Sequence, residues 1–294
     1  MLFRKVVLVG VGLLGGSLAL AIRERQLASI VQGYVRRDAS RDECAAVGLP
    51  DFASCDLAAV VREADLVILC TPLSQMLPLT RQLLPALKAG AIVSDVGSVK
   101  GSVVAELEAL VAGAGGHLVA AHPMAGGERA GVGAARVDLF RNAVCVVTPT
   151  AKTSAPALQQ VEAFWRALGA RLLRMTPALH DELVARCSHL PHTLAAQLAA
   201  FVLDPAHPKE QAQLCASGFR DTTRIASGSP EMWRDIALAN REALARALGA
   251  CIADLEQIRQ QVAAGDGAAL EAFFALAKAR RDAWNERSAS PSPE

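Results

Sequence analysis

The sequence predicts an α/β domain of the doubly wound type followed by an all-helical domain. From residue 4 to about 175, short apolar runs rich in β-branched residues alternate with longer Ala/Leu-rich stretches. Continuously apolar runs of this length are typical of parallel strands that are covered on both faces. Beyond Thr176 the strand pattern stops, and a length of 294 residues suits two domains. We expect domains at 1–175 and 176–285, and a disordered tail at 286–294.

Seven apolar runs are predicted to be strands of the first domain. They are residues 5–10, 30–35, 65–70, 91–96, 117–121, 143–148 and 170–175. In an open parallel sheet, ligands bind outside the carboxyl ends of the strands. The segments that follow the strands are therefore expected to line one ligand-binding edge.

Composition excludes several classes of function. The chain has 30 Lys and Arg against 29 Asp and Glu, with no basic run, so we expect no nucleic-acid partner. Its seven scattered cysteines form no C-x-x-C pair, which favours reduced thiols in a cytoplasmic protein. Charged or helix-breaking residues interrupt every apolar segment, so neither a membrane span nor a signal peptide is expected. The partner should be a small molecule.

The second domain is predicted from helical spacing, which is clearest over residues 241–262. Its helices are rich in alanine and poor in aromatic residues. So much apolar helix in a short domain is expected to need a second copy of the chain to cover it. We therefore expect a homodimer formed through this domain.

A glycine-rich turn follows the first predicted strand. Gly10, Gly12 and Gly15 have the G-x-G-x-x-G spacing, and an amphipathic helix begins at once. The first two glycines allow a tight turn and the close approach of a pyrophosphate, and the third allows close packing of helix on strand. In this context the motif indicates a Rossmann-type dinucleotide site, with Leu13 and Leu14 at the helix N-terminus that faces the anion.

The residues after the second strand bear on the choice of cofactor. An NAD site normally has an acidic residue here, but the position holds Val35, followed by Arg36 and Arg37. Two guanidinium groups suit the 2′-phosphate of NADP. The alternative is a solvated basic loop in which Asp38 accepts from the ribose hydroxyl. We expect NADP to be favoured and NAD to be possible.

Polar residues gather after the later strands. Thr71 and Pro72 follow the third strand and are expected to contact the cofactor, Ser98 follows the fourth strand, and His122 follows the fifth. A carbinol carbon gives up a hydride readily when its hydroxyl proton is removed, and histidine is the usual acceptor. His122 is thus the candidate base, unless it merely begins a loop. Ser98 either contacts the same hydroxyl or caps the following helix.

Two constellations lie in the helical domain. His189 and His192 are three residues apart, so they share a helical face as substrate contacts or as core or capping residues; without a third ligand, a metal site is not expected. Arg224 is three residues after Asp221, and a guanidinium held by a carboxylate is a natural receptor for a substrate carboxylate. A surface ion pair is the alternative. The run Ser229-Pro230-Glu231 predicts a helix start.

Five motifs of the chain, taken together, are similar to those of one known protein family. In chain order they read GVGLLGGSLA, DVGSVKG, HPMAGGERAG, SHLPH and GFRDTTRIASGSPEMWRDI. Over residues 4 to about 285, the chain resembles the prephenate/arogenate (cyclohexadienyl) dehydrogenase family of tyrosine biosynthesis. The resemblance implies a Rossmann domain and a helical dimerisation domain. It also implies oxidative decarboxylation of a cyclohexadienol with hydride transfer to NAD(P)+, which gives 4-hydroxyphenylpyruvate or tyrosine.

The resemblance also implies roles for individual residues. His122 would accept the proton of the ring C4 hydroxyl, and Ser98 would contact that hydroxyl. Arg224 matches the family position that holds a substrate carboxylate, and Asp221 would orient this arginine. His192 matches a substrate-contacting histidine, and Glu128 matches an acidic residue near the pocket mouth. No chorismate mutase segment precedes the glycine loop and no regulatory domain follows residue 285, so any inhibition by tyrosine is expected to act at the active site.

Two alternatives remain open. A β-hydroxyacid dehydrogenase would have a similar two-domain plan, but that class has a helical-domain lysine with an asparagine four residues later. Here Lys209 is followed at that spacing by Gln213, and Lys278 by Asp282. The other alternative is a non-catalytic NADP-binding sensor, which would have no use for His122.

Overall fold

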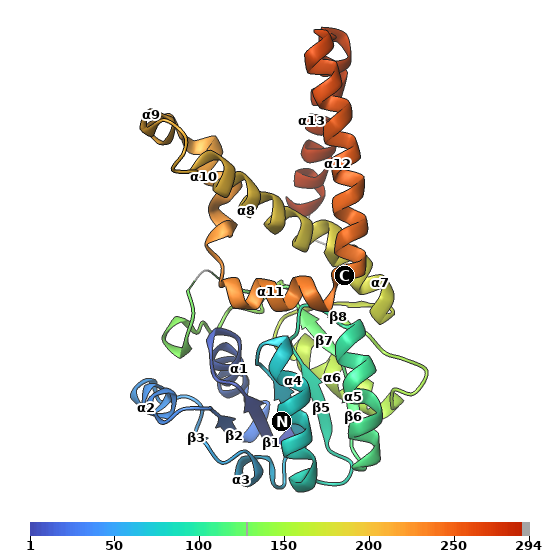
Figure 1. Cartoon of the computed structure of the whole chain (residues 1–294). Helices are drawn as coiled ribbons and strands as arrows, with labels where there is room; N and C mark the ends of the chain where they lie inside the picture. The colour runs from blue at the N-terminus through green and yellow to red at the C-terminus, as the bar shows by residue number, and fades with distance from the viewer. Residues whose placement is uncertain (128, 290–294) are drawn as a thin grey trace. The chain divides into compact units, whose positions relative to one another are not determined.

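The computed structural model describes residues 1–127 and 129–289. Its contacts divide the chain into two compact units, Met1–Leu244 and Ala245–Glu294. The first unit holds every strand of the described residues together with the helices up to α11, as well as the beginning of α12 (Figure 1). No helix among the described residues is long and apolar enough to cross a membrane.

The main sheet is parallel throughout and has the order β3-β2-β1-β4-β5-β6. This order is that of a dinucleotide-binding Rossmann sheet, in which the strand order reverses between β1 and β4. The strands are β1 (Phe3–Val9), β2 (Ala28–Tyr34), β3 (Phe52–Ser54), β4 (Leu66–Leu69), β5 (Ile92–Asp95) and β6 (His117–Val119). The predicted fold class is confirmed.

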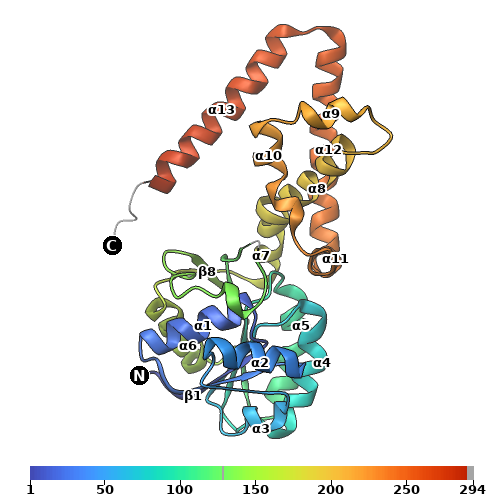
Figure 2. The same cartoon turned by 90° about the vertical axis from the view of Figure 1, so that its left-hand side faces the viewer.

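Helices cover both faces of this sheet (Figure 2). Val6 and Leu8 of β1 face one apolar core, whereas Val7 and Val9 face the other, because successive side chains of a strand alternate between faces. The first core is closed by α1 (Leu13–Glu24), α2 (Asp38–Val47) and α6 (Ala155–Ala167). The second is closed by α3 (Leu57–Val61), α4 (Leu73–Leu83) and α5 (Gly101–Gly113). This double covering explains the continuously apolar strands.

Two of the predicted strands do not belong to the main sheet, which corrects the sequence-based expectation. A second sheet has the order β7-β8-β9 and consists of β7 (Ala121–Pro123), β8 (Val144–Val147) and β9 (Arg171–Arg174). The predicted strand 117–121 is divided at Ala120 between β6 and β7, and β7 pairs antiparallel with β8. An apolar run reports burial, but it does not report which strand is the neighbour. The three-residue β3, in which Phe52 is exposed and the other two residues are partly buried, has no apolar run and was not predicted.

The helical part of the first unit begins directly after β9. A long helix consists of α7 (Pro177–Val184), a π-helical turn η3 (Ala185–His189) and α8 (Leu190–Val202). Pro191 has no N–H to donate to the preceding turn, and the widened turn lies just before it. The remaining elements of this part are α9 (Lys209–Gln213), α10 (Ser217–Thr223), a 3-10 turn η4 (Arg224–Ser227) and α11 (Pro230–Ala239). The predicted helix start at Ser229 is confirmed, because its Oγ accepts from the N–H of Met232.

The second unit is helical. It contains most of α12 (Arg241–Ala264) and all of α13 (Gly267–Ala289), so residues 286–289 of the predicted disordered tail are helical; residues 290–294 lie outside the described residues. Both helices expose large apolar side chains. They include Ile252, Leu255, Val262, Phe273, Phe274, Leu276 and Trp284. The domain limits expected at residues 175 and 285 stay a prediction.

Candidate active site

The glycine turn between β1 and α1 has the geometry of a dinucleotide cradle. Gly10 has φ +99°, and a Cβ on Gly15 would lie 2.1 Å from the carbonyl oxygen of Gly10. Side chains are therefore excluded at both positions. A Cβ on Gly12 would meet nothing within 4 Å, so the space beside this residue is open. The cradle fits a pyrophosphate.

Leu13 and Leu14 form the first turn of α1, where backbone N–H groups have no partner within the helix. Thr71 lies beside Gly10, and its Oγ1 is buried without a hydrogen-bond partner. Pro72, which precedes α4, is exposed next to it. An orphaned hydroxyl and a helix N-terminus beside open space are what a phosphate-bearing cofactor would use.

Arg36 and Arg37 are both exposed between β2 and α2. Asp38, the alternative ligand for a ribose hydroxyl, forms a 2.9 Å ion pair with Arg41. Arg36 and Arg37 follow the end of β2, which is where the adenosine end of a dinucleotide is bound in this fold.

His122 lies within β7 and not at the beginning of a loop, which corrects the alternative considered from the sequence. Its backbone is paired with Val146 of β8, and its side chain is buried, with 7% exposed. Burial lowers the pKa of His122 well below the usual 6.5, and nearby Lys100 acts in the same direction. The imidazole is therefore neutral at physiological pH and is available as a base.

A buried ion pair fastens β7 to the end of β5. Lys100 and Asp95 are both fully buried and paired with each other, and Lys100 Nζ also donates to the carbonyl of Ala121 at 2.8 Å. The Asp95 carboxylate accepts from the N–H of Ala121 at 3.2 Å. His122 is thus held at the carboxyl end of β5, where Ser98 also lies. Ser98 is partly buried.

Ser98 does not cap α5, which corrects the second alternative. The N-cap residue is Lys100, and the carboxylate of Asp181 on α7 accepts from the N–H groups of Lys100 and Gly101, both at 2.7 Å. A side chain some 80 positions away therefore caps this helix. The Ser98 hydroxyl is left for other partners.

Asp181 also begins a row of buried histidines. His180 Nδ1 lies 2.7 Å from Asp181 Oδ1, and His180 Nε2 lies 2.9 Å from His122 Nδ1. From the other side, Asn240 Nδ2 donates to the backbone carbonyl of Asp181 at 2.8 Å and lies 3.1 Å from His189 Nδ1. These contacts connect the candidate base to the helical domain. Four residues of this network were not predicted from the sequence, namely His180, Asp181, Lys100 and Asn240.

His189 and His192 line an apolar cavity of about 290 Å³ in the helical part. The ring of His192 stacks on Trp233 of α11, with centroids 3.4 Å apart, and Ala226 of η4 also lines the cavity. His189 is 1% exposed, and its Nε2 has no hydrogen-bond partner. Burial lowers the pKa of His189 to about 4 and also lowers that of His192, so both rings are neutral. The cavity is of a size for a small ring compound.

Arg224 is the first residue of η4, two positions before Ala226, and Asp221 is in α10; both side chains are exposed. The predicted carboxylate receptor is therefore close in sequence to Ala226, which lines the cavity. Glu128 lies outside the described residues. No group of three or more potential metal ligands occurs within the described part of the chain.

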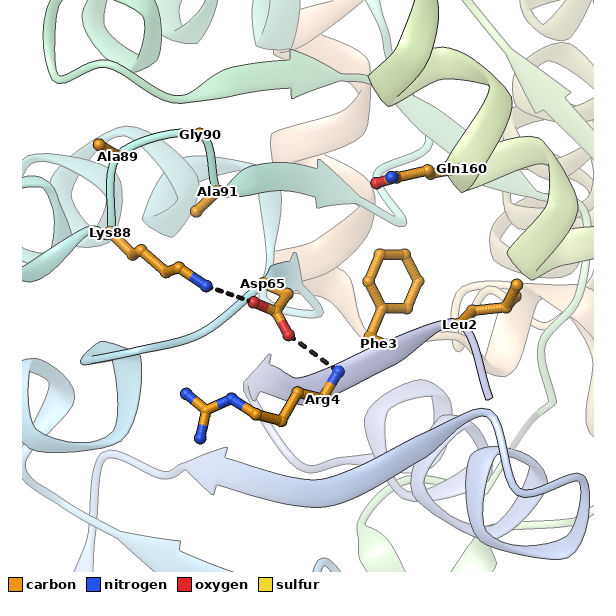
Figure 3. A pocket seen from close by; sticks show the side chains of 9 residues that line it. All are labelled: Leu2, Phe3, Arg4, Asp65, Lys88, Ala89, Gly90, Ala91 and Gln160. Atoms are coloured by element: carbon orange, nitrogen blue, oxygen red, sulfur yellow. Dashed lines mark hydrogen bonds and ion pairs between the residues drawn. The ribbon is translucent and has the colours of Figure 1, made fainter.

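A second hollow lies at the opposite end of the strands and has a structural explanation. It surrounds Asp65, Lys88 and the beginning of β1 (Figure 3). Asp65 accepts from the N–H groups of Arg4 and Lys5 and pairs with Lys88 at 2.6 Å. This carboxylate is occupied in holding strand ends together, so the hollow is not a candidate site.

Known proteins match both the Rossmann part and the helical part of the chain. Residues 18–174 match the family model "Prephenate dehydrogenase, nucleotide-binding domain", and residues 176–276 match "Prephenate dehydrogenase, dimerization domain". The chain is 36% identical over 284 residues to the cyclohexadienyl dehydrogenase of Zymomonas mobilis, with 95% of each chain covered.

Two solved structures are similar over nearly the whole chain. One is the Aquifex aeolicus prephenate dehydrogenase in complex with hydroxyphenyl propionate and NAD+, with a TM-score of 0.88, 30% identity, and 95% and 97% of the two chains covered. The other is the Synechocystis arogenate dehydrogenase, with a TM-score of 0.80, 33% identity, and 96% and 100% covered. The family inferred from the motifs is confirmed: the chain belongs to the prephenate dehydrogenase family.

Proposed function

We propose that this chain is an NAD(P)-dependent dehydrogenase of tyrosine biosynthesis that oxidises and decarboxylates prephenate, arogenate or both. The observation that carries the proposal is a neutral, buried histidine, His122, at the same sheet edge as a glycine-turn dinucleotide cradle. The names of the relatives support it, since they include cyclohexadienyl, prephenate and arogenate dehydrogenases.

The proposed reaction needs a base more than it needs strong electrostatic stabilisation. A bound nicotinamide would supply the acceptor for the hydride that leaves C4 of the substrate ring. His122 accepts the C4 hydroxyl proton, while Ser98 contacts the same hydroxyl. The ring carboxylate then leaves as CO2, and the electron pair of the broken C–C bond moves into the ring. The product ring is aromatic and carries a phenolate oxygen at C4. His122 then returns the proton to the phenolate oxygen, and aromatisation makes the oxidation essentially irreversible.

We assign substrate binding to the helical part. The cavity beside His192 and Trp233 would hold the substrate, and His189 faces it with an unpartnered ring nitrogen. Asn240 Nδ2 already donates to a carbonyl, so its second N–H points to His189 Nδ1 and leaves the proton of His189 on Nε2. His189 thus offers a donor to the substrate. Arg224, oriented by Asp221, would bind a substrate carboxylate, and Glu128 would lie near the pocket mouth.

NADP is the cofactor that the exposed pair Arg36 and Arg37 favours, with NAD as the second possibility. The engagement of Asp38 with Arg41 supports this preference, because the carboxylate that directly follows the two arginines in the chain is already paired. Replacing both arginines by alanine should raise KM for NADP by roughly 10-fold or more, with little change for NAD. Equal changes for the two cofactors would contradict the assignment.

The experiment that tests the function is absorbance at 340 nm with purified protein and each combination of prephenate or arogenate with NADP or NAD. We expect reduction of the cofactor with at least one substrate, and release of CO2 in equal amount. The comparison of kcat/KM between the two substrates identifies the preferred one. No reduction in any combination would overturn the proposal, and activity with a β-hydroxyacid instead would favour the alternative class.

We further propose a homodimer formed through the helical domain. The match of residues 176–276 to a dimerisation domain and the exposed apolar side chains of α12 and α13 support this proposal. Light scattering coupled to size-exclusion chromatography should give twice the mass of the 30.8 kDa chain. A monomer at micromolar concentration would contradict it.

A further inference from the structure

The row His122, His180, Asp181 has a defined direction of hydrogen bonding. Both oxygens of Asp181 accept backbone N–H groups, Oδ1 from Lys100 and Oδ2 from Gly101. With both oxygens already engaged as acceptors, we take the carboxylate as the acceptor in its contact with His180 as well. His180 Nδ1, 2.7 Å from Oδ1, must therefore be the donor in this contact.

The tautomer of His180 determines that of His122. A neutral imidazole has one N–H and one lone pair, so a proton on His180 Nδ1 leaves the lone pair on Nε2. With His180 neutral, this lone pair faces His122 Nδ1 at 2.9 Å, and His122 Nδ1 then carries the proton. In the neutral ring of His122, Nε2 is left as the one atom able to accept a proton.

We propose that His180 and Asp181 are positioning residues that hold His122 in the tautomer whose Nε2 takes the substrate's hydroxyl proton. This inference rests on the proposed function for the identity of the substrate. In the step, the hydroxyl O–H bond breaks and an Nε2–H bond forms. The resulting imidazolium keeps its Nδ1–H bond to His180, and the reverse transfer to the phenolate restores the neutral ring.

The burial of the row gives the arrangement its rigidity. His180 has no exposed surface, and its ring meets that of His122 edge to face, with centroids 5.1 Å apart. Asp181 is fixed in turn by the two N–H groups of the α5 terminus and, through its backbone, by Asn240. With water excluded, no solvent molecule replaces His180 as the acceptor for His122 Nδ1–H. The Asp181 carboxylate that caps α5 thus also determines which ring nitrogen of His122 carries the proton.

Asp181 is a poor position for a test, because its replacement would uncap α5 as well. His180 separates the two roles, since its ring nitrogens contact only His122 and Asp181 among the described residues. His180→Phe keeps the aromatic packing and removes both contacts. His180→Gln keeps an amide oxygen to accept from His122 and an amide N–H to donate to Asp181. His117→Phe, at the exposed beginning of β6, is the matched control for loss of a histidine.

The first measurement is the ¹⁵N spectrum of histidine-labelled protein, which requires no turnover. We expect neutral His122 in the wild type with a protonated Nδ1 and an unprotonated Nε2, and a shift towards the other tautomer in His180→Phe. A wild-type His122 that carries its proton on Nε2 would overturn the proposal. Because this readout is independent of activity, an enzyme inactive towards both substrates would refute the proposed function and leave the tautomer result standing.

The second measurement is the pH profile of kcat and KM. We expect His180→Phe to lower kcat by roughly 10–10³-fold with KM nearly unchanged, and to move the acid limb of the kcat/KM profile. His180→Gln should recover most of kcat, and His117→Phe should behave as the wild type. Equal loss in the Phe and Gln variants, or an acid limb that does not move, would show a merely structural role and refute the proposal.

Discussion

The glycine turn and the base site lie at the same sheet edge but are built in different ways. The turn is made by residues within six positions of one another, and its shape follows from the absence of side chains at Gly10 and Gly15. The base site is assembled from the end of β5, from β7 and from α7, with Asp181 reaching Lys100 across 81 positions. Local backbone constraints can be predicted from a sequence, whereas contacts between side chains that are distant in the chain cannot.

The largest expected effect tests whether the base site does the chemistry. His122→Asn should lower kcat by roughly 10²–10⁴-fold with little change in substrate KM, as for the loss of a general base. Asparagine retains a hydrogen-bonding side chain but accepts no proton at neutral pH. Steady-state kinetics with the preferred substrate checks this expectation. A variant with wild-type kcat would place the chemistry elsewhere, while cofactor affinity, which depends on the glycine turn, should be unaffected.

The two regions also show how far the sequence could be read. The Rossmann domain, the helical domain and the glycine turn were predicted correctly, because their signals are apolar runs, helical spacing and glycine positions. The second sheet was not predicted, because Val144–Val147 are as apolar as the strands of the main sheet. The local sequence of a strand does not show which strand it pairs with. The edge strand β3, with only three residues, is also too short to give a recognisable apolar pattern.

The site was predicted in part for the same reason. His122 stood out because it ends an apolar run, and the motifs around His192 and Arg224 made these residues candidates. Asp181 carried a signal that was overlooked: an aspartate next to a histidine, five residues after Thr176, in what the structure shows to be α7. Its partner at the α5 terminus could not be inferred, because the two helices are brought together only by the folded chain.

A pH effect on stability is expected from the buried histidines and not from the glycine turn. Burial lowers the pKa of His189 to about 4, whereas the unfolded chain binds this proton near pH 6.5. The unfolded state therefore gains protons first, and the free energy of unfolding falls as pH drops through this window. At about 1.4 kcal/mol per pKa unit, His189 accounts for roughly 3 kcal/mol.

Urea unfolding at pH 7 and near pH 4 measures this loss. In His189→Gln the difference between the two pH values should shrink by roughly the same amount. His117→Gln, a change at an exposed histidine, should leave the difference unaltered. An unchanged pH dependence in His189→Gln would show that this ring is not the acid-sensitive group.

A smaller effect is expected at the substrate side of the site. Arg224→Ala should raise substrate KM by roughly 10–100-fold with a smaller change in kcat, because a charge-assisted hydrogen bond to a carboxylate is lost. Arg224→Lys should recover part of the affinity as a point charge without the bidentate geometry. The KM for the cofactor is the internal control. A normal substrate KM in Arg224→Ala would refute the carboxylate role.

The smallest effect is expected from a matched pair of helix caps, one in the Rossmann domain and one in the helical part. Ser154 Oγ accepts from the N–H of Ala157 at 3.5 Å in the Rossmann domain, and Ser229 Oγ accepts from the N–H of Met232 at 3.4 Å in the helical part. Each Ser→Ala change should lower the free energy of unfolding by about 0.5–1 kcal/mol. Because α11 carries Trp233 against His192, only Ser229→Ala should also raise substrate KM, by a few-fold. Equal effects of the two changes on KM would mean that the cavity wall does not depend on how α11 begins.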